Sequence, residues 1–131
     1  MGSSAFKDSA FYGDLSTPYM SGDFPYASFR NCKSLTSISN LGNITSICKN
    51  ARGGYGEGSF TGCTSLTSVV IPSTVTIIGA SAFGGCPISN INITWENITQ
   101  LGSSAFDGRS DWNFIVNLAN LTNTTLNFLG K

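Results

Sequence analysis

The amino-acid sequence predicts a repeat solenoid, mainly β, in which about five coils of 23 residues stack with short parallel strands and Gly-rich turns. The first observation behind this prediction is a phenylalanine that recurs in steps of 23, 31, 23 and 23 residues, at Phe6, Phe29, Phe60, Phe83 and Phe106. The second is a shared phrase around it: a small residue, Phe, two residues and Cys. A phrase repeated at a fixed distance indicates one structural unit that buries its apolar side against copies of itself.

Each unit contains two short apolar segments separated by turn residues. In the copy after Phe60, "LTSVVIP" at 66–72 predicts a strand rich in β-branched residues that ends at Pro, and "VTIIG" at 75–79 predicts a second strand that ends at Gly. The segment "ASAFGGC" at 80–86 is short and Gly-rich, which is typical of a turn or one helical turn. We therefore expect a curved stack with a parallel sheet along one face and strands ~4.8 Å apart.

The units define the domain organisation. One solenoid domain is expected over 1–131, with a degenerate N-terminal repeat at 1–28, regular repeats at 29–106 and a degenerate C-terminal repeat at 107–131. The unit at Phe83 loses one residue before Ile88 and regains it around Trp95, which indicates selection for stacking. Both ends are aromatic and neither shows an obvious polar cap, so we expect a piece of a longer array or ends that meet partners, including other copies of the chain.

Composition excludes several classes of function. Lys plus Arg and Asp plus Glu are both 7, and 11% of the residues are charged, so the basic footprint of a nucleic-acid-binding protein is missing. We expect no membrane insertion, because no apolar segment approaches the length of a span. We also expect no signal peptide in the chain shown, because Met1 is followed by "GSSAF" and not by a charged and then apolar segment. The absence of histidine removes the commonest general base and the commonest metal ligand, and no cofactor is expected.

The stretch "SFTGCTSLTSVVIPSTVTIIG" at 59–79 resembles the BspA-like, or Treponema pallidum-type, leucine-rich repeat. The resemblance is close from Ala27 to about Phe106 and weaker at both ends. The chain departs from the pattern in the unit of Phe6, in the additional residues before Phe60, and at Arg109, which stands where Cys is expected. The resemblance implies a bacterial cell-surface or secreted protein that binds host matrix proteins or other bacteria.

The cysteines show which way the repeat faces. Cys32, Cys63 and Cys86 occupy one offset in successive coils, so we expect an inward-facing ladder of free thiols that pack as small hydrophobic groups. A disulfide between neighbouring coils is the alternative. Three thiolates do not complete a tetrahedral zinc site unless Cys48, at a different offset, joins them, so no metal site is expected.

No catalytic residue is expected. The nearest approach to paired carboxylates is Asp107 and Asp111 with Asp8 and Asp14, which we place in turns beside Gly and Ser and not across a cleft. The serines have no His or Lys partner at a useful spacing. Five N-x-T sequons are interpreted as turn and strand-surface residues, with glycan attachment as the alternative in a eukaryotic secreted protein: Asn43, Asn92, Asn97, Asn120 and Asn123.

Two surfaces are candidates for binding. The first is the eight-residue excess between Cys48 and Phe60, which must bulge outward and contains Lys49, Arg52 and Tyr55. The second is the solvent side of the strands, rich in hydroxyl and amide groups. Its residues are Thr36, Ser37, Ser39, Thr67, Ser68, Val70, Asn90, Asn92, Asn113, Phe114 and Val116. Of these, Thr36, Thr67, Ser68, Asn90 and Asn92 are the predicted binding residues.

Together these observations predict a non-enzymatic extracellular module that adheres to a protein or glycan on a host or neighbouring cell, located at the cell surface or secreted. The alternative is a structural component of a larger assembly, such as a phage fibre, a decoration protein or a surface layer, and the alternative location is a virion.

Overall fold

The structure is a computed structural model that describes residues 5–25, 27–49, 58–102 and 105–106. The C-terminal repeat expected at 107–131, with Asn113, Phe114, Val116, and the sequons at Asn120 and Asn123, lies outside the described residues. So do Arg52 and Tyr55 of the predicted loop.

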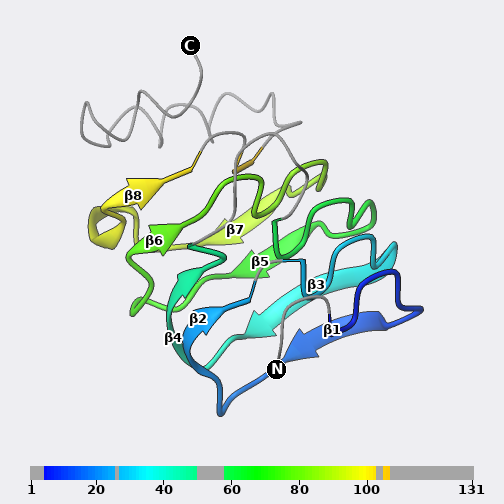
Figure 1. Ribbon diagram of the computed structural model, residues 1–131, viewed down its shortest axis with the longest axis horizontal. Helices are drawn as coiled ribbons and strands as arrows, with labels where there is room; N and C mark the ends of the chain where they lie inside the picture. The colour runs from blue at the N-terminus through cyan, green and yellow to red at the C-terminus, as the bar shows by residue number, and fades with distance from the viewer. Residues whose placement is uncertain (1–4, 26, 50–57, 103–104, 107–131) are drawn as a thin grey trace.

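The chain forms a β-solenoid with two parallel sheets (Figure 1). Each of four successive coils contributes one strand to each sheet, in the order of the sequence. Sheet A contains β1 (Tyr12–Ser16), β3 (Ser34–Asn40), β5 (Ser68–Val70) and β7 (Asn90–Asn92). Sheet B contains β2 (Ser21–Phe24), β4 (Asn43–Ile47), β6 (Ile77–Ile78) and β8 (Gln100–Leu101). We number the coils 1 to 4 by these strand pairs.

The second sheet is a difference from the expectation of one sheet along one face. The apolar segment predicted to end at Gly79 does pair with its neighbours, because Ile77 and Ile78 lie beside Ser46 and Ile47 of the coil before and Gln100 and Leu101 of the coil after. Each coil therefore turns a corner between its two strands. The predicted 23-residue period and parallel strands are confirmed.

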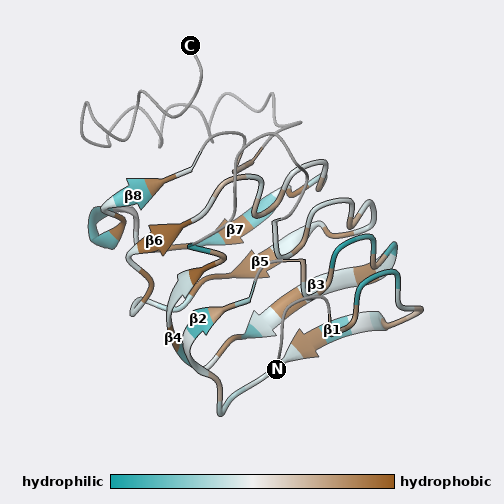
Figure 2. Ribbon diagram, in the orientation of Figure 1, coloured by the Kyte–Doolittle hydropathy of each residue, from teal (hydrophilic) through white to brown (hydrophobic). Residues whose placement is uncertain are grey.

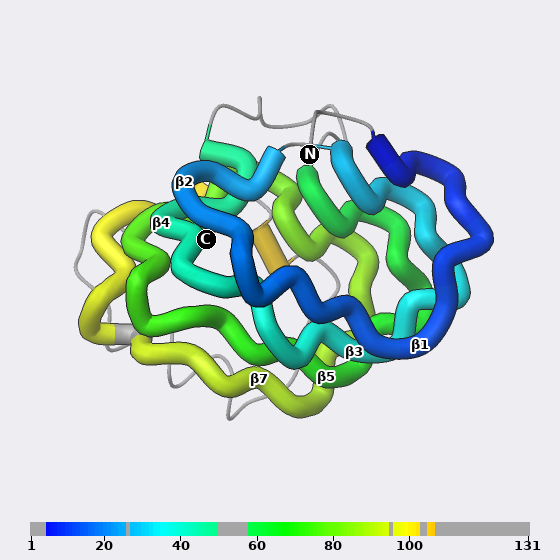
Figure 3. Tube along the Cα trace, turned by 90° about the horizontal axis from the view of Figure 1, so that it is seen from below, coloured from blue at the N-terminus to red at the C-terminus, as the bar shows by residue number. Residues whose placement is uncertain are grey.

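The third side of each coil is a turn that contains the recurring phenylalanine. Seen along the stack, the turns lie above one another as the strands do (Figure 3). The backbone N–H groups of Phe6, Phe29, Phe60 and Phe83 donate to carbonyls of the following coil, over 2.7 to 2.9 Å. Backbone polar groups that are buried inside a stack need hydrogen-bond partners, and these bonds supply them in the turns although the turns form no strand.

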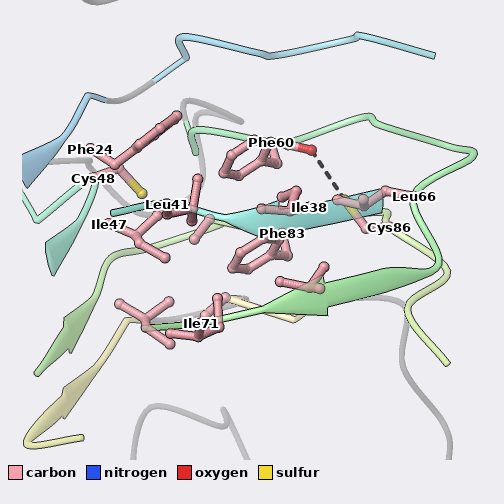
Figure 4. Close-up of a cluster of buried hydrophobic side chains, with 14 of the residues drawn as sticks. Phe24, Ile38, Leu41, Ile47, Cys48, Phe60, Leu66, Ile71, Phe83 and Cys86 are labelled. Carbon is pink, nitrogen blue, oxygen red and sulfur yellow. Dashed lines mark hydrogen bonds between the residues drawn. The ribbon is translucent and has the colours of Figure 1, made fainter. Parts of the chain in front are cut away.

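The core is the space enclosed by the three sides, and its side chains come from equivalent positions of successive coils (Figures 2 and 4). On sheet A, Ile38, Val69 and Ile91 are register partners, and on sheet B, Ile47, Ile78 and Leu101 are register partners. Apolar residues on the strands alternate with polar ones because successive side chains of a strand point to opposite faces.

The phenylalanines form one internal stack, which confirms the predicted phase of the repeat. The ring of Phe83 lies 5.3 Å from that of Phe60 and 5.3 Å from that of Phe106, with interplanar angles of 5° and 9°. Phe29, Phe60 and Phe83 are 1%, 0% and 0% exposed, whereas Phe6 at the end of the stack is 42% exposed. The stack is therefore closed inside the molecule and open at coil 1.

The buried cysteine ladder is also confirmed. The thiols of Cys32, Cys63 and Cys86 each lie 3.1 Å from the backbone oxygen of the phenylalanine in the preceding coil, and each donates to it. Figure 4 shows the bond from Cys86 to Phe60. All four cysteines are free and buried. A hydrogen bond with the Cys86 side chain, and then burial, raise the pKa of the Cys63 thiol. Burial raises the pKa of Cys32 and of Cys48.

The one-residue slip in coil 4 is absorbed by two turns. In the coil before, the N–H of Leu66 donates to the oxygen of Cys63, three residues back, whereas the N–H of Ile88 donates to Cys86, two residues back. The tighter turn around Pro87 accounts for the missing residue. A 3-10 turn, η1 (Trp95–Asn97), accommodates the residue that is regained before Ile98. Ile88 and Ile98 therefore stay in the core at their repeat positions.

Candidate binding surface

The outer face of sheet A carries the predicted strand-surface residues. We call this surface the sheet A face and define it by Thr36, Ser37, Ser39, Thr67, Ser68, Val70, Asn90 and Asn92. Ser37, Ser68 and Asn90 are register partners across β3, β5 and β7, and Val70 is paired with Asn92. All eight residues are exposed or half-buried. The structure therefore brings five of the eight predicted site residues, Thr36, Thr67, Ser68, Asn90 and Asn92, onto one continuous face.

The hydroxyl groups at the start of these strands form a ladder that points in one direction. Thr36 donates to the backbone oxygen of Gly13 over 3.2 Å, Thr67 to that of Thr36 over 3.5 Å, and Ser89 to that of Thr67 over 3.5 Å. Each hydroxyl hydrogen is thus directed at the coil before. Thr36, Thr67 and Ser89 are exposed, and a hydroxyl oxygen that donates its hydrogen can still accept, so this row offers acceptors to a partner.

A carboxylate marks the coil 1 end of the sheet A face. Asp14 on β1 accepts a hydrogen bond from the Ser37 hydroxyl over 2.7 Å and another from Ser39. The sequence predicts that Asp14 lies in a turn. It lies instead within a strand, because Tyr12 to Ser16 pair with β3 despite the glycine at position 13.

Sheet B carries a second hydroxyl row, which the sequence analysis missed. Thr45, Thr76 and Thr99 are exposed, and Thr76 and Thr99 donate to the backbone oxygens of Thr45 and Thr76 over 3.5 and 3.1 Å. These threonines follow one another in steps of 31 and 23, as Phe29, Phe60 and Phe83 do. The period alone could have identified this row.

Of the predicted loop residues, the structure describes Lys49, which is not part of the sheet A face. Lys49 is exposed and follows β4 of sheet B, where its backbone N–H donates to the Asp23 carboxylate over 3.1 Å. Arg52 and Tyr55 lie outside the described residues. Three sequons, Asn43, Asn92 and Asn97, have exposed asparagines, and the Asn97 amide donates to the Ser73 oxygen over 3.0 Å.

The described part of the chain contains no cluster of three or more His, Cys, Asp or Glu side chains that could hold a metal ion. Among the same residues, no helix has the length and apolar character needed to cross a membrane.

Comparison with known proteins agrees with the repeat. The family model for a BspA type leucine rich repeat region matches residues 1–53 and 54–129, in 6 copies. Searches of curated proteins and of solved structures found no match to this chain.

Proposed function

Because this chain belongs to the BspA-type leucine-rich repeat family, whose members are commonly surface and binding proteins, we propose that it is a non-enzymatic adhesion module. Its partner is a protein or glycan on a host or neighbouring cell, and it acts at the cell surface or after secretion. Repeats of this family are typically non-catalytic.

The observation that carries this proposal is the sheet A face. It extends over three parallel strands, β3, β5 and β7, with Asp14 of β1 at its edge. None of its eight residues is charged, and it presents hydroxyl and amide groups in rows along the stack. A neutral surface with regularly spaced acceptors and amides is suited to hydrogen-bonding the hydroxyls of a glycan or the backbone of a peptide. The rigid core beneath it keeps these groups in place, which lowers the entropic cost of binding.

Thr67 and Thr76 provide a matched pair for testing which face binds. Both are exposed, both lie in coil 3, and both donate to a threonine oxygen of coil 2 over 3.5 Å, but Thr67 is at sheet A and Thr76 at sheet B. For a probe that the parent chain binds, we expect Thr67→Arg to weaken binding at least tenfold, about 1.4 kcal/mol, and Thr76→Arg to leave binding unchanged. The probes are immobilised extracellular-matrix proteins and a printed glycan array.

Thermal melting accompanies both variants, since either arginine should leave the core intact. An equal loss of binding in Thr67→Arg and Thr76→Arg, or no loss in Thr67→Arg, would contradict binding at the sheet A face. A folded parent chain that binds neither class of probe would contradict adhesion and favour the structural role in an assembly.

A further inference from the structure

Coil 1 differs from the coils that follow it at the same position of both sheets. Coil 2 has Thr36 and Ser37 on β3, and Thr45 and Ser46 on β4. The residues 23 positions earlier are Gly13 and Asp14 on β1, and Gly22 and Asp23 on β2. β1 and β2 are the outer strands of their sheets in the described part of the chain. The same Gly-Asp pair therefore replaces a Thr-Ser pair on each of two edge strands.

Both glycines have a backbone conformation that a regular strand does not use. The φ angles are +84° at Gly13 and +76° at Gly22, and the pairing with coil 2 changes register directly after each glycine. A side chain at either position would meet nothing within 4 Å, unlike one at Gly79, which would overlap the Cys48 carbonyl. These two glycines are thus required for their conformation and not for space. An edge interrupted in this way offers no continuous ladder to an added strand.

A carboxylate accompanies each of the three sides of coil 1. Asp8 accepts from the Asn31 amide over 3.0 Å, Asp14 from Ser37 over 2.7 Å, and Asp23 from Ser46 over 2.6 Å. Each donor lies 23 residues after its acceptor. The equivalent positions in coil 3 are Gly62, Ser68 and Ile77, so the charged acceptor is confined to coil 1 among the described coils.

We propose that coil 1 is an end cap, whose Gly-Asp pairs prevent a second copy of this chain from extending sheet A or sheet B at this end. An added strand would have to remove water from the Asp14 and Asp23 carboxylates, which is costly without a new partner. The cap is needed because coil 1 carries apolar surface that a second copy could cover. Phe6, Tyr12 and Tyr19 are 42%, 80% and 97% exposed. The aromatic ends of the sequence predict self-association through the solenoid ends, and the cap excludes this end from it.

The test gives coil 1 the residues of coil 2 in the full chain: Gly13→Thr, Asp14→Ser, Gly22→Thr and Asp23→Ser. Light scattering after size exclusion, over a series of concentrations, is expected to show the mass of a dimer or larger species that the parent does not form. Glu96→Gln, on the exposed η1 turn, is the control for lost negative charge and should behave as the parent. Circular dichroism and melting report whether each variant folds.

A folded fourfold variant with the same mass as the parent at every concentration would overturn the cap, as would equal association of Glu96→Gln. If the fourfold variant does not fold, Asp14→Asn with Asp23→Asn decides. This milder variant keeps both glycines and loses the two charges. The amide oxygens of the new asparagines can still accept hydrogen bonds from Ser37 and Ser46. Association of this variant above the parent's would support the cap, and parent-like mass would overturn it.

Discussion

Truncation of Phe83 tests the central feature of the fold, the aromatic stack. Phe83 is fully buried, and its ring is stacked on both faces, against Phe60 and Phe106. Phe83→Ala removes both ring contacts, each worth about 0.5 to 1.5 kcal/mol beyond area burial, and leaves a cavity. Rigid coils above and below cannot collapse into it without breaking their hydrogen bonds. We therefore expect a loss near the usual range for buried phenylalanine, about 3 to 5 kcal/mol.

Urea denaturation followed by circular dichroism measures this loss, and the melting temperature should fall by roughly 10 to 20 °C. Phe6→Ala is the matched control, because Phe6 occupies the same repeat position but is 42% exposed and stacks on one neighbour in the repeat series, Phe29, at 4.9 Å. Its truncation should cost about 1 to 2 kcal/mol. A loss below about 1 kcal/mol for Phe83→Ala, or equal losses for the two variants, would refute the two-sided stack as the source of stability.

Two further predictions concern the thiol ladder and the inserted loop. Because the pKa of Cys63 is raised above its ordinary value of 9.0, unfolded thiols ionise above that pH while the folded thiol stays neutral, so the free energy of unfolding should fall as pH rises above 9. Cys63→Ser should lower the free energy of unfolding by about 1 to 3 kcal/mol at neutral pH. It should also reduce the fall of that free energy with pH above 9, by up to about 1.4 kcal/mol per pH unit. Urea denaturation of the variant and the parent at neutral pH and above pH 9 measures both effects, and identical curves for the two proteins at each pH would contradict the buried ladder. Deletion of 50–57, the inserted loop outside the described residues, should change stability by less than about 1 kcal/mol, since the 23-residue period is complete without it, and weaken binding at least roughly tenfold; a normal melt with normal binding would leave the loop without a role.

Much of the fold follows from local spacing in the sequence. The steps between Phe29, Phe60 and Phe83, with Cys at a fixed offset, were enough to predict a stacked solenoid, an internal ring stack and a buried thiol ladder. Alternation along the strands likewise predicted that Thr36, Thr67 and Asn90 face solvent. Such features are set by one coil against its copy, so periodicity is sufficient to specify them.

Other features depend on how the coils close in space. The corner between the two apolar segments produces a second sheet, and the row of Thr45, Thr76 and Thr99 belongs to it. Asp14 looked like a turn residue beside Gly13, because glycine followed by aspartate favours turns locally. The tertiary structure places Asp14 on the edge strand β1. There Gly13 has a positive φ, and the Asp14 carboxylate accepts a hydrogen bond from Ser37 of the next coil. Local propensity records what a segment favours alone, whereas the neighbouring coil determines which backbone groups are paired and which carboxylates find donors.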